Sequence, residues 1–202
     1  GFDLLGVTLI GSLDILWAAL LTAMVVAWKR PTLRAILFGL AASSKQIPWL
    51  LAPFLIIRIW REEDGSSPLR RACRFAAIGG LTFLTVNGIF ILRDADAWLR
   101  GVAGPMWDDL VFISQGGLSS ITHLGLANLP KSYYLVVTLA VFGLLVFAYW
   151  RHHETLRNAL WIFPGISMWF SYRTLATYWV FWVFPLVATL VAGPICRPSR
   201  PS

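Results

Sequence analysis

Long apolar runs alternate with short polar breaks along nearly the whole chain. About 20 apolar residues are enough for a helix to cross the ~30 Å hydrocarbon core of a bilayer. One polar stretch, 93–131, is much longer than the other breaks and contains two short amphipathic pieces around Trp98 and Leu110. The pattern predicts an all-α, polytopic membrane helical bundle. Its expected spans are 12–28, 33–60, 70–92, 132–150, 156–170 (with a kink at Pro164) and 174–191, and a polar tail occupies 194–202.

The second of these runs carries a lysine, Lys45, near its middle, and Pro48 follows three residues later. A proline has no backbone N–H, so Pro48 leaves the carbonyl of Ser44 without its helical partner and disfavours helical angles at the residue before it. The run is therefore either one tilted, kinked helix or a broken, re-entrant pair of half-helices, 33–46 and 48–60.

Positive charge distinguishes these two alternatives, because Lys and Arg prefer the cytoplasmic side of a membrane. With the 93–131 loop outside, a single helix places nine Lys and Arg residues inside and seven outside. A hairpin moves Lys29, Arg30 and Arg34 inside, which gives twelve against four, with Lys45 left at the tip. The count favours the hairpin, whose tip would then be embedded on the non-cytoplasmic side.

The hairpin places Lys45 on the same side as the long loop, Arg173 and the Asp14 end of the first span. An embedded cation beside free backbone groups suits an anion, and a lipid-linked phosphate has its tail in the bilayer and its head at the interface. Arg173 offers a second, forked contact to phosphate oxygens, and tyrosine rings suit a sugar. We therefore predict a substrate-binding site that consists of Lys45, Gln46, Arg173, Asp14, Tyr172 and Tyr178.

Each assignment has a structural alternative. Lys45 could instead snorkel to the interface or pair with Asp14, and Asp14 could cap the first span. Arg173 could be an ordinary loop anchor. The acidic residues of the long loop, Asp94, Asp96, Asp108 and Asp109, could have a chemical role or simply be exposed, and Asp94 and Asp96 match a D-x-D metal-binding pattern.

The composition agrees with a membrane protein and excludes several other classes. The chain is 57% hydrophobic and 13% charged, whereas soluble domains carry about 25% charged residues. Its eleven Trp and thirteen Phe residues are typical of aromatic belts at membrane interfaces. No basic cluster lies on a polar domain, which argues against nucleic-acid binding. We expect a multi-pass integral protein of the plasma membrane, and its oligomeric state is left open.

No metal or cofactor is predicted. Cys73 and Cys196 match no metal-binding or redox spacing, and the run His152-His153-Glu154 follows a span in the manner of a solvated loop. The chain begins at Gly1 without a methionine or a signal peptide, so we expect the C-terminal part of a longer protein.

The segment GLAASSKQIPWLLAPFLIIRIWR, which begins at Gly39, resembles a motif of the GT-C superfamily of membrane glycosyltransferases. It is most similar to the polyprenyl-phosphate-mannose-dependent mannosyltransferases, and the likeness covers about 1–61 well and 132–193 loosely. The resemblance implies a multi-spanning, inverting enzyme that moves a sugar from a polyprenyl-phosphate donor, on the non-cytoplasmic face, to a lipid, glycan or protein acceptor. The matching positions are Gly39, Leu40, Ala41, Lys45, Pro48 and Pro53.

By this resemblance Lys45 takes the role of binding the donor phosphate. The catalytic carboxylate of such enzymes lies in the first outer loop near the N-terminus, so the catalytic residue of this chain is left unknown. Two alternatives from other classes stay open: a transporter or flippase of a lipid-linked or anionic substrate, and a non-catalytic membrane subunit. A transporter is expected to show an internal repeat, and the Lys45 segment has no counterpart in the second half of the chain.

Overall fold

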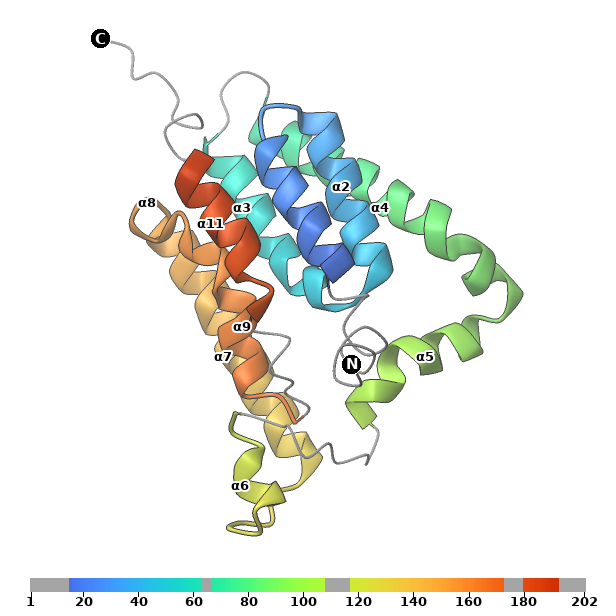
Figure 1. Ribbon diagram of the computed structural model, residues 1–202, viewed down its shortest axis with the longest axis vertical. Coiled ribbons are helices and arrows are strands. Elements are labelled where there is room, and N and C mark those ends of the chain that lie inside the picture. Colours follow the sequence, from blue (N-terminus) through green and yellow to red (C-terminus); the bar gives the residue numbers. More distant parts are fainter. Residues whose placement is uncertain (1–14, 63–66, 108–116, 173–179, 193–202) are drawn as a thin grey trace, which may run out of the picture.

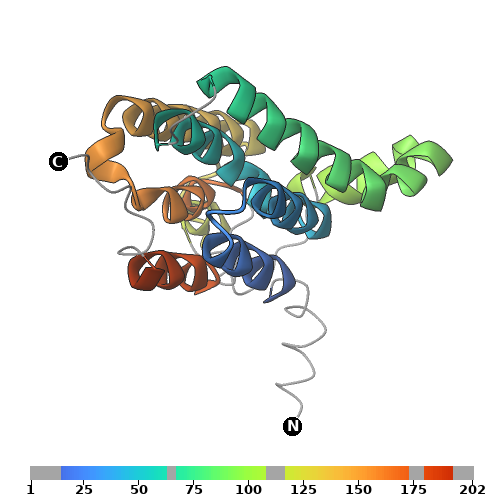
Figure 2. The same ribbon diagram turned by 90° about the horizontal axis from the view of Figure 1, so that it is seen from above.

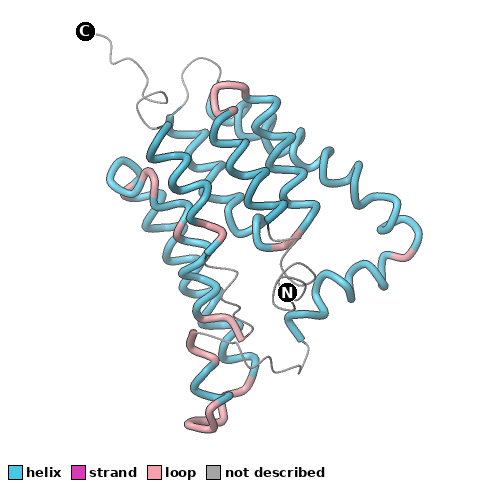
Figure 3. Tube along the Cα trace, in the orientation of Figure 1, coloured by secondary structure: helices cyan, strands magenta, loops and turns pink. Residues whose placement is uncertain are grey.

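All regular structure in the part of the chain that the computed structural model describes, residues 15–62, 67–107, 117–172 and 180–192, is helical (Figure 3). This confirms the predicted all-α class. The elements are a first helix Ile15–Val26, α2 Pro31–Ser44, the 3₁₀ helix η1 Ile47–Leu51, α3 Ala52–Glu62, α4 Pro68–Arg93, α5 Ala95–Trp107, α6 Ser120–His123, α7 Lys131–Arg151, α8 His153–Leu156, the 3₁₀ helix η2 Ala159–Trp161, α9 Phe163–Trp169 and α11 Val183–Ala192.

Prolines and short polar side chains set where several helices begin. Pro31 opens α2 and Pro68 opens α4, positions where the missing N–H of proline has no helical partner in any case. Ser67 caps α4, because its hydroxyl accepts the Arg70 amide at 3.3 Å. Asp94 caps α5 in the same way, by accepting the Ala97 amide at 2.8 Å.

The predicted helix break is present. α2 ends at Ser44, Lys45 has extended angles (φ −162°, ψ 157°), and the chain then reverses through η1 into α3. Figure 1 shows α2 descending and α3 returning in the opposite direction, so that the start of α2 and the end of α3 lie at the same end of the molecule. The broken helix pair of the sequence prediction is therefore confirmed as a backbone feature.

An aromatic core joins the first helix, α3, α7, α9 and the C-terminal helix. Trp17 is fully buried and its ring lies 4.9 Å from that of Trp182, where the first helix and α11 run side by side (Figure 2). Phe54 of α3 packs against Tyr149 and Phe163, with ring centroids 5.5 and 5.3 Å away. These large buried rings hold the hairpin against the C-terminal half of the chain.

α2 and α4 cross so closely that their backbones nearly touch. A Cβ atom added to Gly39 would lie 2.5 Å from the carbonyl oxygen of Gly79 and 2.7 Å from the Cβ of Thr82. Only glycine allows this approach at position 39, since the backbone of the neighbouring helix cannot move aside. The contact fixes α4 against the hairpin.

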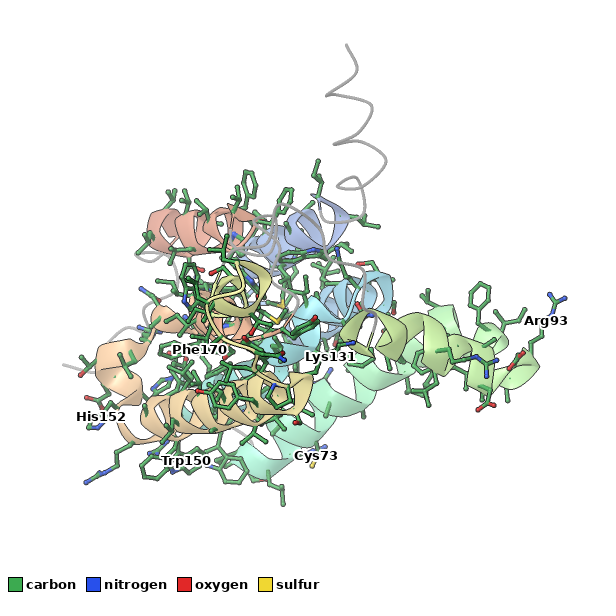
Figure 4. All side chains as sticks on the ribbon, turned by 90° about the horizontal axis from the view of Figure 1, so that it is seen from below. Cys73, Arg93, Lys131, Trp150, His152 and Phe170 are labelled. Carbon is green, nitrogen blue, oxygen red and sulfur yellow. The ribbon has the colours of Figure 1, made fainter. Side chains whose placement is uncertain are left out.

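Within the described residues two helices, α4 and α7, are long and apolar enough to cross a membrane. Both are mostly exposed, and large apolar side chains such as Leu81, Ile89 and Leu139 point away from the protein. Beyond its crossing with α2, α4 runs away from the bundle to Arg93 at its far end, and α5 turns back beneath it (Figures 1 and 4). Such surface is what a lipid environment accommodates.

Three parts of the chain differ from, or lie beyond, the sequence prediction. The segment 156–170 is not one helix: α8, η2 and α9 follow one another, and α9 begins next to Pro164, whose ring cannot continue a helix from the preceding turn. Of the two amphipathic pieces in the long loop, the one around Trp98 is α5, and the other lies outside the described residues. Within 174–191, the structure describes a helical residue at 180, a turn at 181–182 and α11.

Candidate functional site

The broken end of α2 is closed by side chains. The last carbonyls of a helix have no helical N–H partner, and leaving them unsatisfied in a membrane costs several kcal/mol each. The Ser44 hydroxyl donates to the Ala41 carbonyl at 2.8 Å, and the Trp49 indole N–H donates to the Ala42 carbonyl at 2.8 Å. The Asn87 amide of α4 donates to the Ser43 carbonyl at 3.4 Å. Side-chain hydrogen bonds therefore stabilise the end of α2 at the break.

Lys45 follows this capped end directly and is half-buried. Pro48, four positions after Ser44, cannot donate to the carbonyl of Ser44, so the helix stops and Lys45 leaves its axis in an extended conformation. The carbonyl end of a helix carries partial negative charge, which favours a cation there. The sequence thus places a positive charge at the tip of the hairpin, next to the capped carbonyl end of α2.

α5 docks onto the tip from the side of α4. The Gln46 side-chain amide donates to the backbone carbonyl of Val102, and the Trp98 indole donates to the Asn87 side-chain oxygen at 3.2 Å. Gln46 was predicted to bind substrate, and its amide nitrogen is engaged within the protein. The tip, α4 and α5 are therefore connected by hydrogen bonds that pass through Asn87 and Gln46.

A row of aromatic rings lies beside these hydrogen bonds. The Trp49 ring packs edge-on against Phe83 of α4 with centroids 5.7 Å apart, and Phe83 packs in turn against Trp98 of α5 at 6.2 Å. Trp49 is 38% exposed. The row gives the Lys45 tip an apolar flank that extends toward the exposed surface of α4.

Tyr172 belongs to a second group of aromatic residues. Its ring lies 5.6 Å from that of Tyr134 and 5.3 Å from the ammonium of Lys131, which opens α7. Tyr134 is buried and shares a hydrogen bond with Thr122 of α6. Lys131 is a cation that the sequence reading did not assign to the site.

Asp14, Arg173 and Tyr178 lie outside the described residues, so their predicted place beside Lys45 stays a prediction. In Figure 1 the tip between α2 and α3 lies near mid-height, whereas the start of α7 and the end of α9 lie below it.

A charged cluster that the sequence reading missed lies at the opposite end of the hairpin. Glu62, at the end of α3, accepts hydrogen bonds from Arg58 at 3.0 Å and from Arg157 at 2.6 and 3.1 Å. His153 Nε2 lies 3.4 Å from the same carboxylate, and the Tyr149 hydroxyl donates to the Arg157 carbonyl at 3.2 Å. The cluster ties the end of α3 to α7 and α8.

His153 corrects the expectation of a solvated loop at 152–154. It is only 8% exposed and packs edge-on against Tyr149 with centroids 5.2 Å apart, whereas His152 and Glu154 are exposed. The pKa of His153 lies below its ordinary value of 6.5, first because burial disfavours the charged ring and also because Arg58, Arg157 and Arg61 are nearby. Glu62 acts in the other direction, but it is already paired with two arginines.

The signal for this cluster was only partly readable from sequence. Arg58 and Glu62 are four positions apart, the spacing at which helical side chains pair. Arg157 is 95 positions from Glu62, and no local pattern connects them. Among the described residues no three His, Cys, Asp or Glu side chains come together as a metal site would need.

Two comparisons with known proteins, one with curated proteins and one with solved structures, found no match. A third comparison is positive. The family model of glycosyltransferase family 87 matches residues 3–177, which is most of the chain and includes the break, α4, α5 and α7. The match confirms the predicted membrane glycosyltransferase. The chain belongs to glycosyltransferase family 87.

Proposed function

We propose that this glycosyltransferase takes its sugar, mannose in the first instance, from a polyprenyl-phosphate donor and passes it to a lipid, glycan or protein acceptor on the non-cytoplasmic face. In this proposal Lys45 binds the phosphate of the donor. The observation that carries it is the capped break: a helix is interrupted within apolar surroundings, and a lysine stands at the interruption.

The chemistry of the tip matches that of the donor. A charged residue at the centre of a membrane segment costs about 2.5–3.5 kcal/mol on insertion scales and is usually functional. A phosphate that is attached to an isoprenoid chain would meet the ammonium of Lys45, while the chain itself would lie along apolar surface. The Trp49–Phe83–Trp98 row and the exposed apolar residues of α4 supply such surface next to the tip.

The distribution of cations supports the non-cytoplasmic placement of the tip. Most Lys and Arg residues of the described part gather where α2 and α4 start and where α3 and α7 end, the end opposite the tip (Figure 1). Positive residues favour the cytoplasmic side. The cations at that end are Lys29, Arg30, Arg34, Arg58, Arg61, Arg70, Arg71, Arg74, Arg151 and Arg157.

The remaining predicted residues complete the proposed site. Arg173 would supply a forked second contact to the phosphate, Tyr172 and Tyr178 would contact the sugar, and Gln46 and Asp14 would lie at its edge. Lys131, which lies beside Tyr172, joins this set. We place the enzyme as a multi-pass protein in the plasma membrane.

Replacing Lys45 tests the proposal directly. In Lys45→Ala we expect donor binding to weaken about 10- to 150-fold, because a hydrogen bond to a charged group contributes about 1.5–3 kcal/mol, and transfer of sugar from polyprenyl-phosphate mannose to be lost at ordinary donor concentrations. Membrane insertion and the melting temperature should stay unchanged. Lys45→Arg should restore little, since a planar fork does not replace a compact ammonium.

The matched control is Arg100→Ala on α5, whose exposed side chain pairs only loosely with Asp96 at 3.5 Å. It removes one cation from the same side of the molecule and should leave transfer intact. Wild-type transfer by Lys45→Ala, measured with labelled donor in membranes that contain the enzyme, would rule out the phosphate role.

A further inference from the structure

One cap of the broken helix comes from outside the hairpin. Asn87 lies on α4, 44 positions from Ser43, and donates its side-chain amide to the carbonyl of Ser43. In a continuous α-helix that carbonyl would accept the amide of the residue four positions later, Ile47. Asn87 therefore competes with continuation of the helix, whereas the next carbonyl, that of Ser44, has no such choice because Pro48 lacks an N–H.

We infer that Asn87 is a positioning residue for Lys45: it stabilises the end of α2 at Ser44 and thereby keeps the lysine at the tip. This inference rests on the proposed phosphate role of Lys45. If the helix continued beyond Ser44, Lys45 would be its next residue and would lie about 100° around the helix axis from Ser44. Its extended backbone (φ −162°, ψ 157°) would become helical, and its side chain would lie on a helix face instead of at the tip.

The side chain of Asn87 is itself oriented by α5. Trp98 donates its indole N–H to the Asn87 oxygen at 3.2 Å, so the amide nitrogen of Asn87 is the atom that faces α2. The nitrogen lies 3.4 Å both from the Ser43 carbonyl and from the Phe83 carbonyl of its own helix. α5 thus acts on Lys45 through two side chains, and the position of α5 is linked to the site.

A double-mutant cycle on the enzyme in lipid nanodiscs separates this role from a general structural one. Binding of undecaprenyl phosphate is measured for the wild type, Asn87→Leu, Lys45→Ala and the double variant. When Lys45 is present, we expect Asn87→Leu to weaken binding roughly five- to tenfold, which corresponds to the loss of one hydrogen bond. In the Lys45→Ala background, Asn87→Leu should leave binding unchanged. Asn87→Gln, which keeps both polar atoms, should recover part of the affinity.

The matched control is Thr85→Val, two positions away on the same helix, where an exposed hydroxyl bonds only to its own helix at Leu81. It should bind undecaprenyl phosphate as the wild type does. If Asn87→Leu proves too unstable to purify, Trp98→Phe replaces it: the ring contact with Phe83 remains, the indole donor is lost, and a weaker effect of the same kind is expected.

The binding measurements distinguish the role of Asn87 from that of Lys45. Wild-type binding by Asn87→Leu, or the same weakening with and without Lys45, overturns the positioning role and leaves the function of Lys45 standing. Wild-type binding by Lys45→Ala removes the proposed phosphate role, and the inference with it. Weakening that appears only while Lys45 is present supports both.

Discussion

The hairpin of α2 and α3 has polar groups at both of its ends, and the two ends are built differently. At the tip, neutral hydroxyl, indole and amide donors satisfy the carbonyls of a broken helix, and the cation Lys45 follows them. At the opposite end, Glu62 is surrounded by Arg58, Arg157 and His153. Neutral groups hold the path of the backbone at the tip, whereas at the opposite end a single carboxylate, that of Glu62, is shared by two guanidinium groups.

Because of this difference, we expect the two ends to contribute differently to folding stability and to donor binding. Buried charges that satisfy each other tie elements together, and removal of one partner leaves the others exposed to the full cost of desolvation. Neutral caps determine the path of the backbone at a lower energetic cost per group. We therefore expect changes in the Glu62 cluster to affect folding first, and changes at the tip to affect donor binding first.

The largest effect is expected for Glu62→Gln. The variant keeps the shape of the side chain but leaves Arg58, whose side chain is 4% exposed, beside Arg157 without a compensating negative charge. Loss of one partner of a buried pair costs about 3–5 kcal/mol, so the melting temperature in detergent micelles should fall sharply. Asp96→Asn, which breaks an exposed pair with Arg100, serves as control and should melt as the wild type does. Equal melting of the two variants would show that the charged cluster is not a stability element.

The sequence predicted the hairpin but not the cluster, for a physical reason. A proline after an embedded lysine acts locally, on the angles and hydrogen bonds of its own neighbours, and charge counting adds a global constraint that needs no contacts. Glu62 and Arg157 meet only because α3, α7 and α8 pack together. His153 was assigned to a loop because it follows the end of a predicted span, and burial of a single ring by tertiary packing leaves no mark in that local pattern.

The caps at the tip were equally hidden. Trp49 lies seven positions from Ala42 and reaches back over the turn, while Asn87 comes from another helix. A break in an apolar helix requires that the free carbonyls at its end find hydrogen-bond donors. The sequence pattern does not specify which side chains supply those donors. The position of the break could therefore be predicted from the sequence, whereas the side chains that cap it could be identified only from the structure.

An intermediate effect is expected for Trp49→Phe. The ring contact with Phe83 is kept, and the N–H that satisfies the Ala42 carbonyl is lost. An unsatisfied buried carbonyl costs about 1–3 kcal/mol, so we expect a modest fall in the free energy of unfolding together with weaker binding of undecaprenyl phosphate. Trp60→Phe at the opposite end, where the ring only packs near Trp150, should leave that binding unchanged. A loss of stability without any loss of binding would place Trp49 with the Glu62 cluster as a purely structural residue.

The smallest effect is expected for the pH dependence of stability that His153 contributes. Because the pKa of His153 in the folded protein lies below 6.5, the unfolded chain binds a proton between that lower pKa and 6.5 that the folded protein does not. The free energy of unfolding therefore falls as the pH is lowered through this window, levels off below the folded pKa, and is insensitive to His153 above 6.5. The groups that face the ring are Glu62, Arg58, Arg61, Arg157 and Tyr149.

His153→Phe isolates that contribution, since it keeps the edge contact with Tyr149 and cannot take up a proton. Unfolding curves at pH 7.5, 6.5 and 5.5 should show less loss of stability for His153→Phe than for the wild type, and His152→Asn, at an exposed position, should follow the wild type. A steeper loss in His153→Phe would mean that protonation of His153 stabilises the fold by pairing with Glu62. In that case the Glu62 carboxylate would accept a third positive partner in addition to Arg58 and Arg157.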